Sequence, residues 1–373
     1  MKETVGIITM HQVLNCGSAL QAYALQKVVE SLGFDVEIID YKYPNKYHKS
    51  LRNKKVNILS YIIERCYTDM VRLYLKQLFK PFYKKFYHLS KIKYNNSQSI
   101  RKCPPTYDIY ISGSDQVWNP DYIGNDTNFM LDFVDSPNKI AYAGSIANNI
   151  IQNKKLDTYV TSWKKYKSLS VREERSVDFL SELCNKSVDF VLDPSLLLTP
   201  NNWREIEEMS TVKYDKPYIL IYILGYSFPV YDYANSLIDY VAKETGLDVV
   251  LFIYSRAHRR ELSCNYKSES KVSPQNFIYL INHASLVITD SFHATAMSIN
   301  LSRPVYPLIK SKDNIDNRVF SLLCSLGIDE WAIQKDMPFD KLPPLTPSYS
   351  AVQNKLSDLR KSSIDYLKKN LIK

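Results

Sequence analysis

The chain has 373 residues, more than one compact core normally holds and enough for two domains. Hydrophobic residues make up 45% of it, which argues against a disordered protein. The six cysteines occur singly and form no CxxC pair, so neither a zinc site nor a disulfide framework is indicated, and a reducing cytoplasm is expected. No stretch approaches the ~20 apolar residues of a membrane span, and residues 1–9 do not resemble a signal peptide.

The net charge of +9 is concentrated in one segment. Residues 42–102 hold sixteen lysines and arginines against only Glu64 and Asp69, a net charge of +14, so the rest of the chain carries −5. Apolar residues recur there at helical spacing over 58–82, and Pro81 is expected to bend or break the helix. Three interpretations remain open: a helical subdomain with a solvated basic face, contact with an anionic membrane, and nucleic-acid binding. Nucleic-acid binding ranks last of the three and is not expected, because no RNA- or DNA-binding motif accompanies the charge.

The rest of the chain alternates between strand and helix patterns. In the first half, strands are predicted over 5–9, 36–40, 107–112, 128–134, 139–144 and 190–192. One helix is predicted over 19–32, and a second follows residue 176 and ends at residue 183. In the second half, strands are predicted over 218–224, 249–254, 286–288 and 305–308, and helices over 230–244, 273–283, 294–299, 316–326 and 353–372.

This order predicts an α/β protein with two Rossmann-like domains facing a cleft. Residues 1–200 form the N-terminal domain, interrupted at about 43–105 by the basic helical insertion, and a turn at 199–201 marks the boundary. Residues 201–345 form the C-terminal domain. Residues 346–373 form a helix that is expected to pack back on the first domain.

The stretch LVITDSFHATAMSI (286–299) carries the strongest candidate for a functional residue. A short apolar strand ends at Thr289 and Asp290, and a helix capped by Asp290 or Ser291 follows. His293 therefore falls in the first helical turn beyond the carboxyl end of a central strand, where ligands bind in open α/β sheets and where helix dipoles favour anions. The alternative is a histidine that only hydrogen-bonds a loop carbonyl.

Two polar turns follow strands of the first domain. Asn15, Gly17 and Ser18 open the helix after the first strand, either as an anion site or merely as a turn with Ser18 as helix cap. Ser114 and Asp115 lie in a turn after the strand at 107–112. Neither turn is a GxGxxG motif or a P-loop, so no dinucleotide or ATP is specified.

Seven segments together resemble the polysaccharide pyruvyl transferase family, in the order of that family. They are NCGSALQAYALQ (15–26), VEIIDYKYP (36–44), ISGSDQVWN (111–119), YAGSI (142–146), LSVREERS (169–176), VLDPSLLL (191–198) and FIYLINHASLVITDSFHATAMSI (277–299). The resemblance implies a fold like that of GT-B glycosyltransferases. It also implies a transferase that moves the pyruvate group of phosphoenolpyruvate onto sugar hydroxyls. The expected location is the cytoplasm, peripheral to the inner face of the membrane if the basic segment contacts anionic lipid. The acceptor would be a surface polysaccharide or its lipid-linked precursor, and the product a pyruvate ketal.

The resemblance also assigns roles to residues. His293 corresponds to the family's catalytic histidine, the general acid and base, and Arg172 to an arginine that holds the donor. Arg172 has an alternative role as a surface ion pair with Glu173, Glu174 or a nearby acid. Further contacts are expected from Asn15, Gly17 and Ser18 to the anionic donor, from Ser114 and Asp115 to sugar hydroxyls, and from Ser291, Phe292 and Arg318. No metal is expected, and no cofactor is expected, because phosphoenolpyruvate serves as a substrate.

One position departs from the family pattern. Many members have Arg-x-His at the end of the central strand, whereas this chain has Ser291-Phe292-His293, so one cationic donor contact is missing. Either Arg318, Arg303 or Lys310 replaces it, or the chain uses another donor. A GT-B-type glycosyltransferase with a nucleotide-sugar donor is the main alternative, kept open by Arg256, Arg259 and Arg260. A non-catalytic sugar-binding or scaffold protein is the third.

Overall fold

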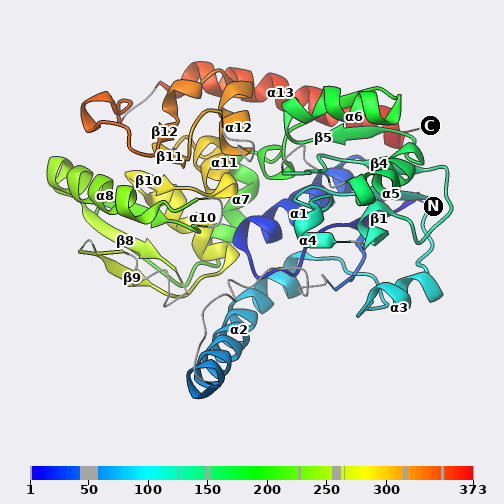
Figure 1. The fold of residues 1–373 in the computed structure, drawn as a ribbon, viewed down its shortest axis with the longest axis horizontal. Coiled ribbons are helices and arrows are strands. Elements are labelled where there is room, and N and C mark those ends of the chain that lie inside the picture. The colour runs from blue at the N-terminus through cyan, green and yellow to red at the C-terminus, as the bar shows by residue number, and fades with distance from the viewer. Residues whose placement is uncertain are drawn as a thin grey trace.

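We analysed a computed structural model of the chain, which describes residues 2–42, 58–124, 126–147, 151, 153–225, 228–253, 262–263, 265–313, 318–345 and 348–372. Within them, the side chains of 58–65, 153 and 154 are not described. Two parallel sheets lie side by side, each with helices on its faces, and a long C-terminal helix runs across both (Figure 1). This arrangement confirms the α/β class with two Rossmann-like halves.

The first sheet has the strand order β2-β1-β3-β4, and every pairing in it is parallel. A further parallel pair, β5 with β6, continues from its edge through bridges from Ile140 to Ser168 and from Gly144 to Val171. The strands are β1 (Thr4–Ile8), β2 (Asp35–Ile38), β3 (Ile109–Ser112), β4 (Lys139–Ala141), β5 (Leu169–Val171) and β6 (Val188–Phe190).

The second sheet has the order β12-β11-β10-β7-β8-β9, again with parallel pairing throughout. Its strand β10 lies between β11 and β7 and is buried on both faces, as its short apolar sequence predicts. The strands are β7 (Tyr218–Tyr222), β8 (Asp248–Phe252), β9 (Lys267–Glu269), β10 (Leu286–Thr289), β11 (Val305–Ile309) and β12 (Ile333–Gln334).

Helices connect the strands and cover the sheets. In the first half they are α1 (Cys16–Ser31), α2 (Ile58–Phe86), α3 (Ser97–Lys102), α4 (Pro120–Ile123), α5 (Asn153–Lys164), α6 (Val177–Cys184) and α7 (Pro200–Glu207). In the second half they are α8 (Tyr231–Thr245), α10 (Pro274–His283), α11 (Phe292–Asn300), α12 (Arg318–Leu326) and α13 (Tyr349–Leu371). None of the helices described here is both long and apolar enough to cross a bilayer.

Two local predictions are wrong. The expected strand at 128–134 is instead the 3-10 helix η2 (Thr127–Met130), whose first turn Asp126 caps by accepting from the backbone N–H of Asn128. The apolar residues of this run are buried in the 3-10 helix and in the loop after it. A short apolar run predicts burial but does not separate strand from helix. Pro81 does not break α2, which continues to Phe86. Pro81 lies on the exposed side of the helix, where water can satisfy the carbonyl that loses its partner.

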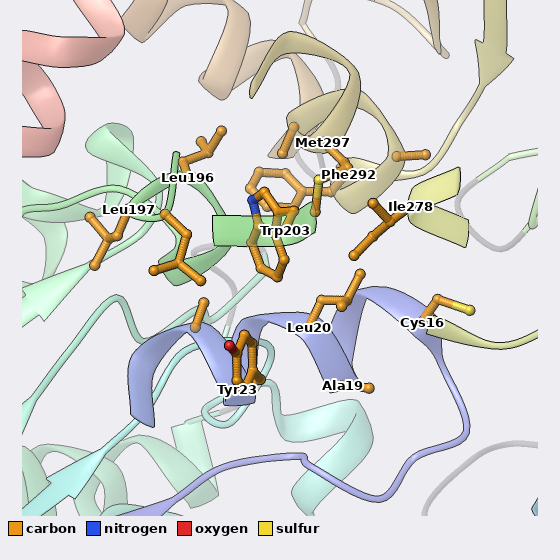
Figure 2. Packing of buried hydrophobic residues seen from close by; sticks show 14 of the residues in the cluster. Cys16, Ala19, Leu20, Tyr23, Leu196, Leu197, Trp203, Ile278, Phe292 and Met297 are labelled. Atoms are coloured by element: carbon orange, nitrogen blue, oxygen red, sulfur yellow. The ribbon is translucent and has the colours of Figure 1, made fainter. Parts of the chain in front are cut away.

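The two halves meet along a shared apolar core. Tyr23 of α1 packs on Trp203 of α7 at 6.1 Å between ring centroids, and Figure 2 shows Trp203 between Leu20 and Tyr23 on one side and Phe292 and Met297 of α11 on the other. The side-chain amide of Asn300, at the end of α11, donates to the carbonyls of residues 195 and 198. Helix α11 is thereby fixed against the first half.

Helix α13 reaches back across the first half. The hydroxyl of Ser363 accepts from the Leu192 N–H, and the hydroxyl of Tyr366 donates to the Ala141 carbonyl. The ammonium of Lys167 donates to the carbonyl of Asn370. These contacts tie the C-terminal segment to β4 and to the loop after β6.

Helix α2 projects from the body of the molecule, with its C-terminal end at the root of α1 (Figure 1). Phe79, Phe82 and Phe86 face inward, and Phe82 and Phe86 contact the ring of Tyr23. Just beyond the helix, the hydroxyl of Tyr87 donates to the carbonyls of residues 11 and 19. The helix is therefore anchored to the loop that leads into α1.

Candidate active site

His293 lies at the junction of the two halves. It follows β10 in the first turn of α11, which Ser291 caps by accepting from the Ala294 N–H at 3.4 Å. Its imidazole rests on the first turn of α1, so closely that a Cβ built on Gly17 would lie 2.2 Å from the ring. Only glycine leaves room for this approach, which places the imidazole of one half against a helix N-terminus of the other.

Each ring nitrogen of His293 faces a carboxylate of the first half. Nδ1 lies 3.9 Å from Oδ1 of Asp193, and Nε2 lies 4.0 Å from Oδ1 of Asp115. Burial lowers the pKa of the imidazole below its usual value. Asp193 and Asp115 oppose that effect, while Arg172 and Arg318 reinforce it. The free protein therefore holds a neutral imidazole poised beside two anions.

Arg172 follows β5 and is buried in the same cluster. Its Nε donates to Oε1 of Glu173 at 3.0 Å, and its Nη1 donates to Oδ2 of Asp193 at 3.0 Å. The guanidinium lies over the ring of Phe292, 4.1 Å from the centroid. Burial alone would lower its pKa, but Glu173, Asp193 and Asp115 together raise it, so the group stays charged. The predicted ion pair between Arg172 and Glu173 is present, but it is buried rather than on the surface.

Asp193 connects the arginine and the histidine, although the sequence had not singled it out. It follows β6 and caps the short helix η4 (Pro194–Leu196), accepting from the backbone and the hydroxyl of Ser195. Burial would raise its pKa, but the charge of Arg172 and the Ser195 hydrogen bonds lower it below the usual value, and His293 adds to this lowering only when it is protonated. The only sequence signal was the turn-forming DPS within VLDPSLLL, which is also typical of a simple helix cap.

The turns of the first half contribute in different ways. Asn15 caps α1 by accepting from the Ser18 N–H, so the cap is Asn15 rather than Ser18. Ser18 donates its hydroxyl to Oδ2 of Asp115 at 2.5 Å, and Asp115 has a φ of +73°. A non-glycine residue in the left-handed region is strained, and such strain gathers at functional sites. Ser114 is fully buried and donates its hydroxyl to Asp193, so it supports the carboxylate instead of facing a sugar.

The candidate replacement cations separate by position. Arg318 begins α12, and its charge adds a smaller effect to two groups that burial dominates: Asp290, whose pKa burial raises, and His293, whose pKa burial lowers. Arg303 donates to Asn282 and precedes β11, so it lies at the amino edge of the sheet, away from His293. Lys310 follows β11 and is exposed. Arg256, Arg259 and Arg260 lie outside the described residues.

Three buried polar atoms of this cluster lack a hydrogen-bond partner: Nη2 of Arg172, Oε2 of Glu173 and Nδ1 of His293. Buried polar groups are normally paired, so this concentration of open donors and acceptors marks a place where a ligand or water binds. The described residues contain no group of three histidine, cysteine or acidic side chains arranged to hold a metal ion. The arrangement offers an anion contact, a hydroxyl contact and a group that can transfer a proton.

Comparisons with known proteins identify the family and the fold of the chain. Residues 15–309 match the profile of the polysaccharide pyruvyl transferase family. No curated protein matches the sequence significantly.

Among solved structures, the chain is similar to a protein assigned as a UDP-N-acetylglucosamine 2-epimerase from Listeria monocytogenes, with a TM-score of 0.50 and 10% identity over 98% of this chain and 90% of that one. It is also similar to S. aureus MnaA bound to UDP, with a TM-score of 0.50 and 12% identity over 100% of this chain and 97% of that one. These similarities show the GT-B-like fold alone. The family match, which covers most of the chain and includes both Arg172 and His293, shows that this chain belongs to the polysaccharide pyruvyl transferase family, a family of transferases.

Proposed function

We propose that the protein transfers the pyruvate group of phosphoenolpyruvate onto two hydroxyls of a saccharide acceptor. In this reaction C3 of the donor gains a proton and one acceptor hydroxyl adds to C2. The bond between C2 and the phosphate oxygen then breaks, and the second hydroxyl adds to C2 to close the ketal. Of the two hydroxyl protons, one replaces the proton delivered to C3 and the other leaves with hydrogen phosphate.

The observation that carries this proposal is the approach of His293, across the junction of the two halves, to the buried ion pair of Arg172 and Asp193. The unpartnered Nη2 of Arg172 binds the carboxylate or phosphate of the donor. An arriving trianion raises the pKa of the neighbouring imidazole, so binding of the donor protonates the group that delivers a proton to C3. His293 thus acts as the general acid and base.

Arg318 supplies the cation that Ser291 does not. It lies at the start of α12, and its charge acts on both His293 and Asp290. The first turn of α1, with Gly17 under the imidazole, provides a positive dipole end for the same anion. On the acceptor side, Asp115 and the open Oε2 of Glu173 accept hydrogen bonds from sugar hydroxyls.

The test compares donors by their effect on thermal unfolding. A ligand at one hundred times its Kd stabilises a protein by about 2.7 kcal/mol, so binding is visible as a raised Tm. Phosphoenolpyruvate is expected to raise the Tm of the protein but not that of Arg172→Ala. A shift with UDP-sugars instead would favour the glycosyltransferase, and no shift with either would favour a scaffold. The proposal includes no cofactor, so dialysis against a chelator is expected to leave phosphate release unchanged.

We also propose that the acceptor is lipid-linked and that the basic segment, residues 42–102, holds the enzyme on an anionic inner membrane face. The part of α2 whose side chains are described supports this. Its outward face carries the exposed apolar side chains of Met70, Leu73 and Tyr74. Exposed lysines follow toward its C-terminal end: Lys76, Lys80, Lys84 and Lys85. Exposed apolar side chains next to cations are typical of helices that bind anionic lipid surfaces.

The anchoring of α2 gives this contact a consequence for catalysis. Tyr87 fastens the end of α2 to the loop that leads into α1, and α1 carries Gly17 beneath His293. A bilayer bound along α2 would therefore lie on the side of the molecule where α2 meets α1, and we propose that a lipid-linked saccharide is presented from that side.

Co-sedimentation with vesicles tests the membrane contact. The protein is expected to sediment with phosphatidylglycerol vesicles at low salt but not with phosphatidylcholine vesicles, and the triple variant Lys76→Glu, Lys80→Glu, Lys84→Glu is expected to stay in the supernatant. The matched control places the same charge changes on exposed lysines elsewhere: Lys243→Glu, Lys341→Glu and Lys361→Glu. Equal loss of binding in both triple variants, or no binding by the unaltered protein, would reject docking through α2.

A further inference from the structure

Asp193 divides its two carboxylate oxygens between two functional groups. Oδ2 accepts from Nη1 of Arg172 at 3.0 Å and from the hydroxyl of Ser114 at 3.0 Å. Oδ1 accepts from the backbone N–H of Ser195 at 3.0 Å and from its hydroxyl at 2.7 Å, and it lies 3.9 Å from Nδ1 of His293. The Asp193 side chain has no exposed surface, so its orientation is fixed entirely by these contacts.

We propose that Asp193 is a positioning residue that orients the guanidinium of Arg172 and the imidazole of His293 together. Through it, the donor clamp and the proton-transferring group keep one fixed relation across the junction of the two halves. This inference rests on the proposed function for its kinetic consequences, but its geometric content does not depend on the donor.

The distances assign the ring nitrogens different tasks. Nδ1 of His293 is buried and without a partner, and Asp193 is the carboxylate on its side of the ring. A movement of about 1 Å between the two halves brings this pair within hydrogen-bond distance. Oδ1 of Asp193 then accepts from Nδ1–H and fixes the tautomer, which leaves Nε2 as the atom that exchanges a proton with the substrate.

Four charged groups affect the pKa of this imidazole, and the effect of Asp193 can be measured separately by substituting Asp193 alone. Asp193 and Asp115 favour its charged form, while Arg172 and Arg318 oppose it. Glu173 contacts Arg172 but has no contact with the imidazole in the described structure. Glu173→Gln is therefore the matched control, because it removes the same charge from the same guanidinium.

The experiment combines kinetics with a substrate-free titration. In 15N-histidine-labelled protein, with the His293 signal assigned from a His293→Gln sample, Asp193→Asn is expected to move the imidazole midpoint to lower pH by about one unit. It is also expected to raise the KM for phosphoenolpyruvate and to lower kcat. Glu173→Gln is expected to raise that KM while leaving the imidazole midpoint in place.

The outcomes separate this inference from the proposed function. If Asp193→Asn leaves the midpoint where it is, or behaves like Glu173→Gln in both readouts, Asp193 does not position His293 and the inference fails. If the midpoint moves but the unaltered protein does not turn over phosphoenolpyruvate, the positioning role holds and the proposed reaction fails.

Should Asp193→Asn not fold, Ser195→Ala carries the test. It removes a hydroxyl donor from Oδ1, which leaves more negative charge facing Nδ1 and is expected to raise the midpoint. An unmoved midpoint in this variant overturns the inference as well.

Discussion

The cluster around His293 and the outward face of α2 use charge in opposite ways. In the cluster, Arg172 is buried and bound by the carboxylates of Glu173 and Asp193, and Asp193 also approaches the imidazole of His293. On α2, Arg72, Lys76 and Lys80 are exposed. Removing one buried charge leaves its partners unpaired, whereas an exposed charge acts mainly through the summed field. The first region is therefore expected to be sensitive to single substitutions, and the second only to several at once.

The two faces of α2 give the largest contrast in stability. Phe82 is fully buried and packs on the rings of Tyr23, Phe86 and Tyr87. Phe82→Ala is expected to lower the free energy of unfolding by about 3–5 kcal/mol. Leu73 is 60% exposed, and Leu73→Ala is expected to change the free energy of unfolding by no more than about 0.5 kcal/mol. Denaturant titration measures both, and equal losses would contradict the assignment of the faces.

Gly17→Ala tests how closely the two halves approach. The added methyl group would lie 2.2 Å from the His293 ring, so the halves must separate or the ring must turn. Overpacking of this kind costs about 1–3 kcal/mol, and we expect turnover to fall with it. Gly246→Ala is the control: its φ of +66° makes alanine strained there, but open space surrounds it. If both variants lose stability and only Gly17→Ala loses turnover, the effect belongs to the site.

The pH dependence of stability distinguishes a buried neutral imidazole from an exposed one. Because the pKa of His293 lies below its usual 6.5 in the folded protein, the unfolded chain takes up the proton more readily. The stabilising contribution is present in full above about pH 6.5 and is lost as the pH falls toward the folded pKa, by at most about 1.4 kcal/mol per pH unit.

Comparison with a variant isolates this contribution. His293→Gln is expected to show a shallower loss of stability between pH 7 and pH 5 than the unaltered protein, measured by urea titration at each pH. Identical slopes would mean that His293 is not buried in its neutral form.

Sequence patterns located most of the strands and the histidine but not the contacts that connect them. The apolar run of β10 and the helix after it predicted the place of His293, because burial and capping leave local signatures. Asp193 was missed because a DPS turn looks the same whether its carboxylate only caps a helix or also binds a distant arginine. The contact of Ser114 was missed for a related reason: nothing local indicates that its hydroxyl donates to Asp193.

The basic segment shows the reverse case. Composition revealed its charge and the spacing of its apolar residues revealed its helix, since neither depends on long-range contacts. The sequence did not distinguish exposed from engaged cations, and the structure pairs Lys85 with Glu205 and Lys93 with Asp40. The outward face of α2 could be assigned only from the structure, in which Phe79, Phe82 and Phe86 are buried on the inward face.

The most direct test of the central claim is the rate of phosphate release from phosphoenolpyruvate by His293→Gln, with an acceptor saccharide present. As general acid and base, His293 is expected to contribute roughly 100-fold or more to turnover. His88→Gln, at an exposed histidine, is the control expected to keep the normal rate. A rate in His293→Gln near that of the unaltered protein would contradict the account.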